Sequence, residues 1–180
     1  MRRFEREASP AERTAWIEAA KRCEWLETDG LGGFASGSVS MVRSRRYHAL
    51  LLTATTPPTG RFVLVNGFDA FIASNEGAFP ISAQYYAPGV THPDGPRRLR
   101  TFTCDPWPTW RFHLENGADI VQEIFVPHGA SAVVVAWRYE GPARSDLRLI
   151  VRPFFSGRDY HALHRDKYKN RRARSCLDFF

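Results

Sequence analysis

Methionine and cysteine are scarce in this sequence, and it has no long apolar run. Two Met and three Cys occur among 180 residues, and the cysteines (Cys23, Cys104 and Cys176) are odd in number and widely spaced. No Cys-x-x-Cys pair is present, so a zinc or redox site has no support. The longest apolar runs, such as Val133 to Trp137, are far short of the roughly 20 residues that a membrane helix needs. We therefore expect no metal, no cofactor and no membrane partner.

A secretion signal is also missing from the N-terminal segment. Charged residues interrupt residues 1–16 at Arg6, Glu7, Glu12 and Arg13, so no apolar signal core is present. Few and unpaired cysteines are typical of a reducing compartment. We expect a cytoplasmic protein.

Positive charge is unevenly distributed, which argues against a nucleic-acid partner. The net charge is +6, but seven Lys/Arg and two Asp between residues 158 and 174 account for +5 of it. A binding face would spread its charge over the fold rather than concentrate it near one end. We expect no nucleic-acid partner.

The remaining composition is that of a globular domain with many turns. Hydrophobic residues make up 43% and charged residues 24%, and the 13 Gly and 12 Pro favour frequent turns. Such values exclude a disordered or fibrous chain, and the length suits one domain with a small appendage.

Short segments rich in β-branched and aromatic residues alternate with turn signals. A helix is expected over residues 8–22, with Ser9 as its cap and Pro10 in its first turn. Strands are expected at 34–42, 46–55, 61–74, 78–84, 110–115, 118–126, 131–139 and 146–154. Spacings of this kind, without a helical period between strands, indicate an antiparallel meander. The predicted fold is all-β, an antiparallel β-sandwich with a short N-terminal helix.

Two dipeptides and one strand carry more detailed predictions. Asn116-Gly117 is typical of a type I′ turn, because both residues tolerate positive φ, and Asn66-Gly67 is either a turn or a bulge within one long strand. The strand at 131–139 is apolar on nearly all of one face and most of the other. That pattern predicts a strand buried between layers.

A glycine-rich segment follows the expected helix. Gly30, Gly32 and Gly33 resemble a phosphate-binding loop, but neither a helix pattern nor a Lys-Ser/Thr pair follows them. They serve either as a functional loop or as a tight structural turn where backbone approaches backbone.

Two further segments offer groups that suit a hydroxyl-rich ligand. Arg45-Arg46-Tyr47-His48 supplies many hydrogen-bond donors, although the arginines could instead pair with carboxylates such as Glu27 or Asp29. Tyr85-Tyr86, Trp107 and Trp110 lie in proline-rich surroundings. Exposed rings would stack on sugars, whereas buried rings would form core beneath a long loop.

No catalytic centre can be identified from the carboxylates. Glycoside hydrolysis needs two carboxyl groups about 5–9.5 Å apart. The candidates are Glu27, Asp29, Asp69, Asp94, Asp105, Glu123 and Asp159, and their spacing singles out no pair. We predict no catalytic residue in this chain.

Read in order, several segments resemble the N-terminal domain of the bacterial and archaeal type of glycogen debranching enzyme (amylo-α-1,6-glucosidase). They are Glu24-Trp25-Leu26, Asp29 to Gly37, Arg45 to Leu51, Thr91 to Gly95, Phe102 with Asp105 to Pro108, Arg152-Pro153-Phe154 and Arg158 to His161. The family usually has Asn where Asp29 stands and Gly where Ala49 stands. Its members continue into a large α-helical toroid that carries the glucosidase carboxylates.

The resemblance implies a supersandwich of antiparallel strands and an α-glucan partner (glycogen or maltooligosaccharides). It also implies packing on a catalytic toroid that lies outside this chain, and no hydrolytic activity of the chain alone. The residues expected to face glucan or that domain are Arg45, Arg46, Tyr47, His48, Trp107, Trp110, Arg158, Asp159 and His161, with Gly30, Gly32 and Gly33 as a structural loop. A purely structural interaction domain is the alternative.

The expected organisation has three parts. Residues 1–22 form a helical lead, residues 23–166 the β-sandwich domain, truncated at its C-terminal end, and residues 167–180 a basic tail. The tail is either a basic arm or non-native sequence from a truncated or frame-shifted gene, and we favour the second interpretation.

Overall fold

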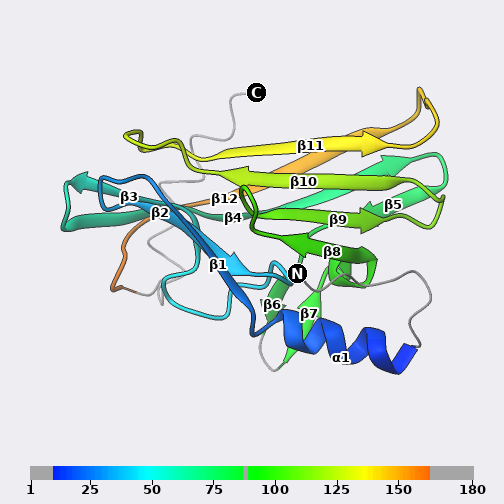
Figure 1. The fold of residues 1–180 in the computed structure, drawn as a ribbon, viewed down its shortest axis with the longest axis horizontal. Coiled ribbons are helices and arrows are strands. Elements are labelled where there is room, and N and C mark those ends of the chain that lie inside the picture. The colour runs from blue at the N-terminus through cyan, green and yellow to red at the C-terminus, as the bar shows by residue number, and fades with distance from the viewer. Residues whose placement is uncertain (1–9, 87–88, 163–180) are drawn as a thin grey trace, which may run out of the picture.

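The computed structural model describes residues 10–86 and 89–162. Two antiparallel sheets face each other, and one helix lies beside them (Figure 1). The first sheet contains β1 (Glu24–Thr28), β2 (Phe34–Ser38), β3 (Ala49–Thr56), β4 (Gly60–Ser74), β5 (Gly77–Pro80) and β12 (Arg148–Asp159). The second contains β8 (Leu99–Thr103), β9 (Thr109–His113), β10 (Asp119–Phe125) and β11 (Val134–Glu140). Outside them lie α1 (Pro10–Ala20), the β6 (Gln84–Tyr86) and β7 (Val90–His92) pair, and the 3-10 helix η1 (Gly95–Arg98).

Both sheets are meanders, as the sequence predicts. Strands β1 to β4 pair in chain order in one sheet and β8 to β11 in the other, and β12 returns to pair with β4. The long β4 pairs with β3 and β5 in turn on one side and with β12 on the other. The predicted all-β sandwich is therefore confirmed.

Large side chains from both sheets fill the space between the layers. Phe68 and Ile72 come from β4, while Trp110, Phe112 and Ile120 come from β9 and β10, and all are at most 5% exposed. In β9 they alternate with less buried neighbours, as expected where one face of a sheet meets the core, whereas the middle of β4 and of β10 is buried on both faces. Burial of these faces is what holds the two sheets together.

The expected helix and all eight expected strands are present, but four strands were missed. They are β1, β6, β7 and β8. In β1 only Trp25 is buried, so its sequence carries almost no apolar alternation. Strands β6 and β7 have three residues each, which is too short for a periodic pattern. The helix cap expected at Ser9 lies outside the described residues.

Two turn predictions had different outcomes. Asn66 is a bulge in β4, because Phe154 pairs with Gly67 and Phe155 pairs with Val65. The type I′ turn at Asn116-Gly117 was wrong: in the described residues only Met41 among non-glycines has positive φ, so Asn116 does not. A three-residue loop with Gly117 at φ 85° joins β9 and β10 instead, and the Asn116 side chain accepts a hydrogen bond from the Ala118 N–H (3.1 Å).

The expectation that residues 131–139 form a strand buried between layers was also wrong. β11 is the last strand of the second sheet. Trp137 packs against the core from one face, whereas Val134 on the other face is 37% exposed. Apolar residues on the outer face of an edge strand produce the same sequence pattern as a central strand.

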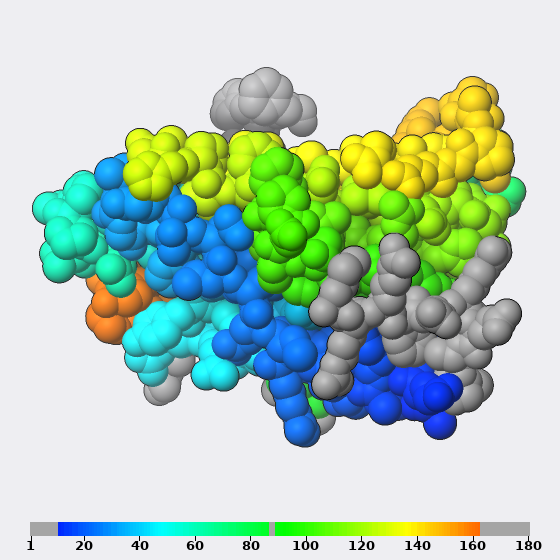
Figure 2. All heavy atoms as spheres, viewed as in Figure 1, coloured from blue at the N-terminus to red at the C-terminus, as the bar shows by residue number. Residues whose placement is uncertain are grey.

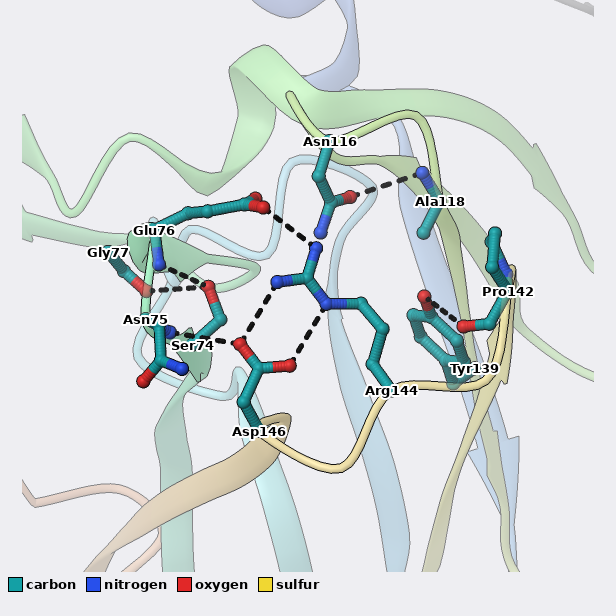
Figure 3. A network of polar contacts seen from close by, with 10 residues as sticks. All are labelled: Ser74, Asn75, Glu76, Gly77, Asn116, Ala118, Tyr139, Pro142, Arg144 and Asp146. Carbon is teal, nitrogen blue, oxygen red and sulfur yellow. Dashed lines mark hydrogen bonds and ion pairs between the residues drawn. The ribbon is translucent and has the colours of Figure 1, made fainter.

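An arginine clamp fastens the β11–β12 connection, which crosses between the sheets, to the β4–β5 turn (Figure 3). Arg144 donates to both carboxylate oxygens of Asp146 (3.0 and 2.9 Å) and to Glu76 (2.9 Å). Asp146 also accepts the Asn75 N–H at 3.1 Å. These bonds lower the pKa of Asp146 from 3.8 to about 2, with Arg144 as the largest cause.

The clamp predicts a specific loss of stability in acid. Because the folded-state pKa of Asp146 lies below its ordinary value, its contribution is present above about pH 4 and is lost as the pH falls toward 2. Arg144→Met should raise the pKa of Asp146 toward 3.8 and flatten the fall in thermal midpoint across that range. Carboxyl titration by NMR checks the pKa, and the exposed Arg22→Met is the control. An unchanged Asp146 titration in Arg144→Met would contradict the prediction.

Candidate functional site

Two segments far apart in the sequence meet at the end of β12. Tyr47 lies in the segment that precedes β3, and Tyr160 and His161 directly follow β12. Figure 2 shows the orange end of β12 beside this cyan segment. The Tyr47 ring lies 5.5 Å from the Tyr160 ring and 5.9 Å from the His161 ring, centroid to centroid. The Tyr47 hydroxyl is 3.0 Å from His161 Nδ1.

Guanidinium groups surround these rings. Arg46 lies 6.0 Å from the Tyr47 centroid and Arg61 lies 5.6 Å from the Tyr160 centroid. We call the set Tyr47, Tyr160, His161, Arg46, Arg61 and Arg158 the Tyr47 cluster. Tyr47 is 40% exposed, so its ring is accessible from solvent.

Arg158 holds the two halves of the cluster together. Its guanidinium donates to the carbonyl oxygens of Arg46 (2.6 Å), Tyr160 (3.2 Å) and Ala162 (3.0 Å). Burial lowers the pKa of Arg158, and the neighbouring charge of Arg46 lowers it further. Asp159 shapes the same turn by accepting the His161 N–H at 2.9 Å. Arg158 and Asp159 therefore position the rings, and Asp159 remains exposed beside them.

His48 and Arg45 hold the segment before β3, which carries Tyr47, against Glu24 of β1. His48 is buried, and its Nδ1 accepts the Ser44 N–H at 3.2 Å. A neutral His48 then carries its proton on Nε2, which lies 3.3 Å from a Glu24 oxygen. Burial is the main cause that lowers the pKa of His48, although Glu24 opposes the shift. Arg45 also pairs with Glu24, so these two side chains serve the structure, as the ion-pair alternative proposed, but with Glu24 instead of Glu27 or Asp29.

The two tryptophans expected to face glucan lie elsewhere. Trp110 is fully buried, donates to the Val39 carbonyl oxygen (2.8 Å) and packs edge-on against Trp25 (5.4 Å). It cannot stack on a ligand at the surface, which corrects the sequence prediction. Trp107 is half-buried on the second sheet against Phe125 (5.2 Å). Neither ring joins the Tyr47 cluster.

The glycine-rich segment is the turn between β1 and β2. Asp29 is buried, and its Oδ1 accepts the N–H groups of Leu31 (2.7 Å) and Gly33 (2.8 Å). Gly30 and Gly32 have φ of 77° and 102°, which side chains rarely adopt. A Cβ on Gly33 would lie 2.7 Å from the Leu52 carbonyl oxygen. These contacts favour the structural-turn alternative.

The structure contains a largely buried polar network that the sequence analysis did not predict. Gln84 accepts from Arg43 and donates to Asp69 (2.9 Å), which in turn accepts from Arg152 (2.6 Å). Burial lowers the pKa of Arg43 to about 10 against the opposing effect of Asp69. Sequence reasoning also missed Tyr160 and Arg61 of the Tyr47 cluster. The only available signal was that Tyr160 stands between Asp159 and His161, which were both selected.

Other classes of site find no support in residues 10–86 and 89–162. No group of three His, Cys, Asp or Glu side chains comes together there as metal ligands. No helix within those ranges has the length and apolar character to span a bilayer. The exposed features that remain are aromatic rings, guanidinium groups and the edges of the sandwich.

The structure thus defines an antiparallel β-sandwich domain with an exposed cluster of aromatic and arginine side chains. Residues 23–176 match the family described as "Glycogen debranching enzyme N terminal". The chain belongs to this family of glycogen debranching enzyme N-terminal domains. Comparisons with curated proteins and with solved structures give no significant match.

Proposed function

We propose that this domain binds the α-glucan substrate of a glycogen debranching enzyme, such as glycogen or a maltooligosaccharide, through the Tyr47 cluster. The domain itself performs no hydrolysis and packs on an α-helical catalytic domain outside this chain. The observation that carries the proposal is the exposed Tyr47 ring, which packs against the partly buried Tyr160 ring beside His161 and two guanidinium groups. Family membership supports the choice of glucan as the ligand.

The chemistry of the Tyr47 cluster suits a sugar. Pyranose rings present apolar C–H faces that pack on flat aromatic rings, while their hydroxyl groups need hydrogen-bond partners at the edges. Tyr47 supplies the ring, and its hydroxyl with His161 and Arg46 supplies polar edges. Each of these groups comes from a loop that Arg158 fastens in place, which reduces the ordering cost of binding.

Tyr47→Ala should weaken binding of maltoheptaose about 3- to 10-fold, because the stacking surface is lost. Isothermal titration of the full chain measures this change. Tyr85→Ala is the matched control, since Tyr85 is 57% exposed but lies on the separate β6–β7 pair. Equal loss in both variants, or no heat at millimolar sugar with the unchanged chain, would refute glucan binding at this cluster.

The second candidate function is that of an interaction domain without sugar binding. It is favoured by the exposed apolar residues of the edge strand β12: Leu149, Ile150, Val151 and Phe155, between 37% and 63% exposed. A groove of about 280 Å³ lies beside Leu149, lined in part by Trp137 and Tyr139 of β11. Concentration-dependent association of the chain that sugar does not affect, seen by analytical ultracentrifugation, would support this function. A monomer at all concentrations would count against it.

The cytoplasm remains the proposed location. Cys23 and Cys104 are both free and exposed, an arrangement that suits a reducing compartment.

A further inference from the structure

We propose that the Tyr47 cluster selects glucan that carries a phosphate monoester over neutral glucan. This inference rests on the proposed glucan-binding function and adds a charged group to the ligand. Its basis is that, among the described residues, no carboxylate forms an ion pair with Arg46, Arg61 or Arg158, whereas many other arginines of the domain have such a partner.

Ion pairs neutralise many arginines of this domain. The arginines with a carboxylate oxygen within 4.0 Å in the described ranges include Arg45, Arg98, Arg111, Arg138, Arg144 and Arg152. At the Tyr47 cluster the guanidinium groups of Arg158 and Arg61 donate instead to neutral backbone carbonyl oxygens. Arg158 donates to three carbonyl oxygens, and Arg61 donates to the Pro58 carbonyl oxygen at 3.0 Å.

One carboxylate lies among these arginines, and it is already engaged. Asp159 accepts the His161 N–H and raises the pKa of Arg158 only against the larger opposing effects of burial and Arg46. Among the described residues the three guanidinium groups of the cluster are thus accompanied by a single carboxylate, which acts on Arg158. A neutral sugar would leave this excess charge unbalanced, whereas a phosphate monoester carries about −1.5 to −2 charges at pH 7.

The geometry suits a ligand with both a ring and an anionic group. Guanidinium groups bind phosphate oxygens through paired N–H donors. The guanidinium of Arg46 lies 6.0 Å from the Tyr47 ring centroid, and that of Arg61 lies 5.6 Å from the Tyr160 ring centroid. A sugar on Tyr47 would thus place a phosphate substituent within the field of the arginines. Neighbouring positive charges also raise the local concentration of anions.

The test is titration of the full chain with four ligands: maltoheptaose, the same oligosaccharide bearing one phosphate monoester, glucose 6-phosphate and inorganic phosphate. We expect the phosphorylated oligosaccharide to bind about 10-fold or more tightly than the neutral one at low salt. That preference should shrink several-fold between 0.05 and 0.5 M salt. It should disappear in the double variant Arg46→Gln/Arg61→Gln, which leaves the Arg158 backbone bonds in place.

Arg22→Gln/Arg97→Gln is the control, because it removes the same charge at two exposed positions away from the cluster. Equal affinity for both oligosaccharides would overturn the phosphate inference and leave glucan binding intact. Tight binding of inorganic phosphate without any binding of maltoheptaose would keep anion recognition but refute the proposed glucan function. No binding of any of the four ligands would overturn both.

Discussion

Trp110→Ala is expected to lower the free energy of unfolding by about 3–5 kcal/mol, the usual range for truncating a buried large aromatic residue. The ring is fully buried and contacts Trp25 (5.4 Å) and Phe102 (5.0 Å). Its removal leaves a cavity between the sheets, and the Val39 carbonyl oxygen loses its hydrogen-bond donor. Since domains of this size are stable by about 5–15 kcal/mol, this single change removes a large fraction of the total.

Urea unfolding followed by circular dichroism measures the loss, and two controls sharpen it. Trp110→Phe keeps an aromatic ring in the core but removes the Nε1–H bond and part of the buried ring volume, so we expect a loss clearly smaller than that of Trp110→Ala. Trp107→Ala removes a half-buried ring and should lower the free energy of unfolding clearly less than Trp110→Ala does. Equal costs for Trp107→Ala and Trp110→Ala would contradict the assignment of Trp110 to the core.

Asp29→Ala should destabilise the domain by about 2–4 kcal/mol, because two backbone N–H groups lose their acceptor at once. Asp29 Oδ1 accepts from Leu31 and Gly33, and the side chain is only 2% exposed. The turn cannot rearrange freely, since the Asp29 carbonyl oxygen also accepts the Gly129 N–H (2.7 Å). That bond ties the β1–β2 turn to the loop before β11.

Asp29→Asn is the matched variant for this prediction. An amide oxygen can accept the same two N–H groups, so we expect a cost below about 1 kcal/mol. Thermal and urea unfolding of both variants check the pair. If Asp29→Asn were as damaging as Asp29→Ala, the hydrogen bonds to Oδ1 would not be what stabilises this turn.

The strands that the sequence predicted are mostly those whose own residues are rich in apolar side chains or carry a turn signal. In β4 and β10 most residues are apolar, and Asn66 marks the bulge by its own turn propensity. Strand β8 follows a 3-10 helix and mixes Arg100 with Thr101 and Thr103. Its membership in the sheet depends on pairing with β9, which no local pattern expresses.

The candidate site was only partly predictable for the same reason. Arg46, Tyr47, Arg158 and His161 were selected from the sequence, and the fold does bring them together. Trp110 was selected on the same grounds of residue type, yet the register of β9 turns it into the core. A tryptophan suits a sugar platform and a core equally well, so residue type alone cannot separate the two.

The sequence by itself determined the all-β meander, the breaks between most strands and the resemblance to one enzyme family, because these follow from local propensity and from the order of short motifs. Only the tertiary structure decided that Tyr47 meets Tyr160 and His161 and that Glu24 neutralises Arg45. It also decided that Arg46, Arg61 and Arg158 gather without an ion pair to any carboxylate in residues 10–86 and 89–162. Such contacts join residues up to 114 positions apart. The Tyr47 contacts arise because β12 returns to pair with β4 through the backbone, and a pairing between segments so far apart is not expressed by any neighbouring residue.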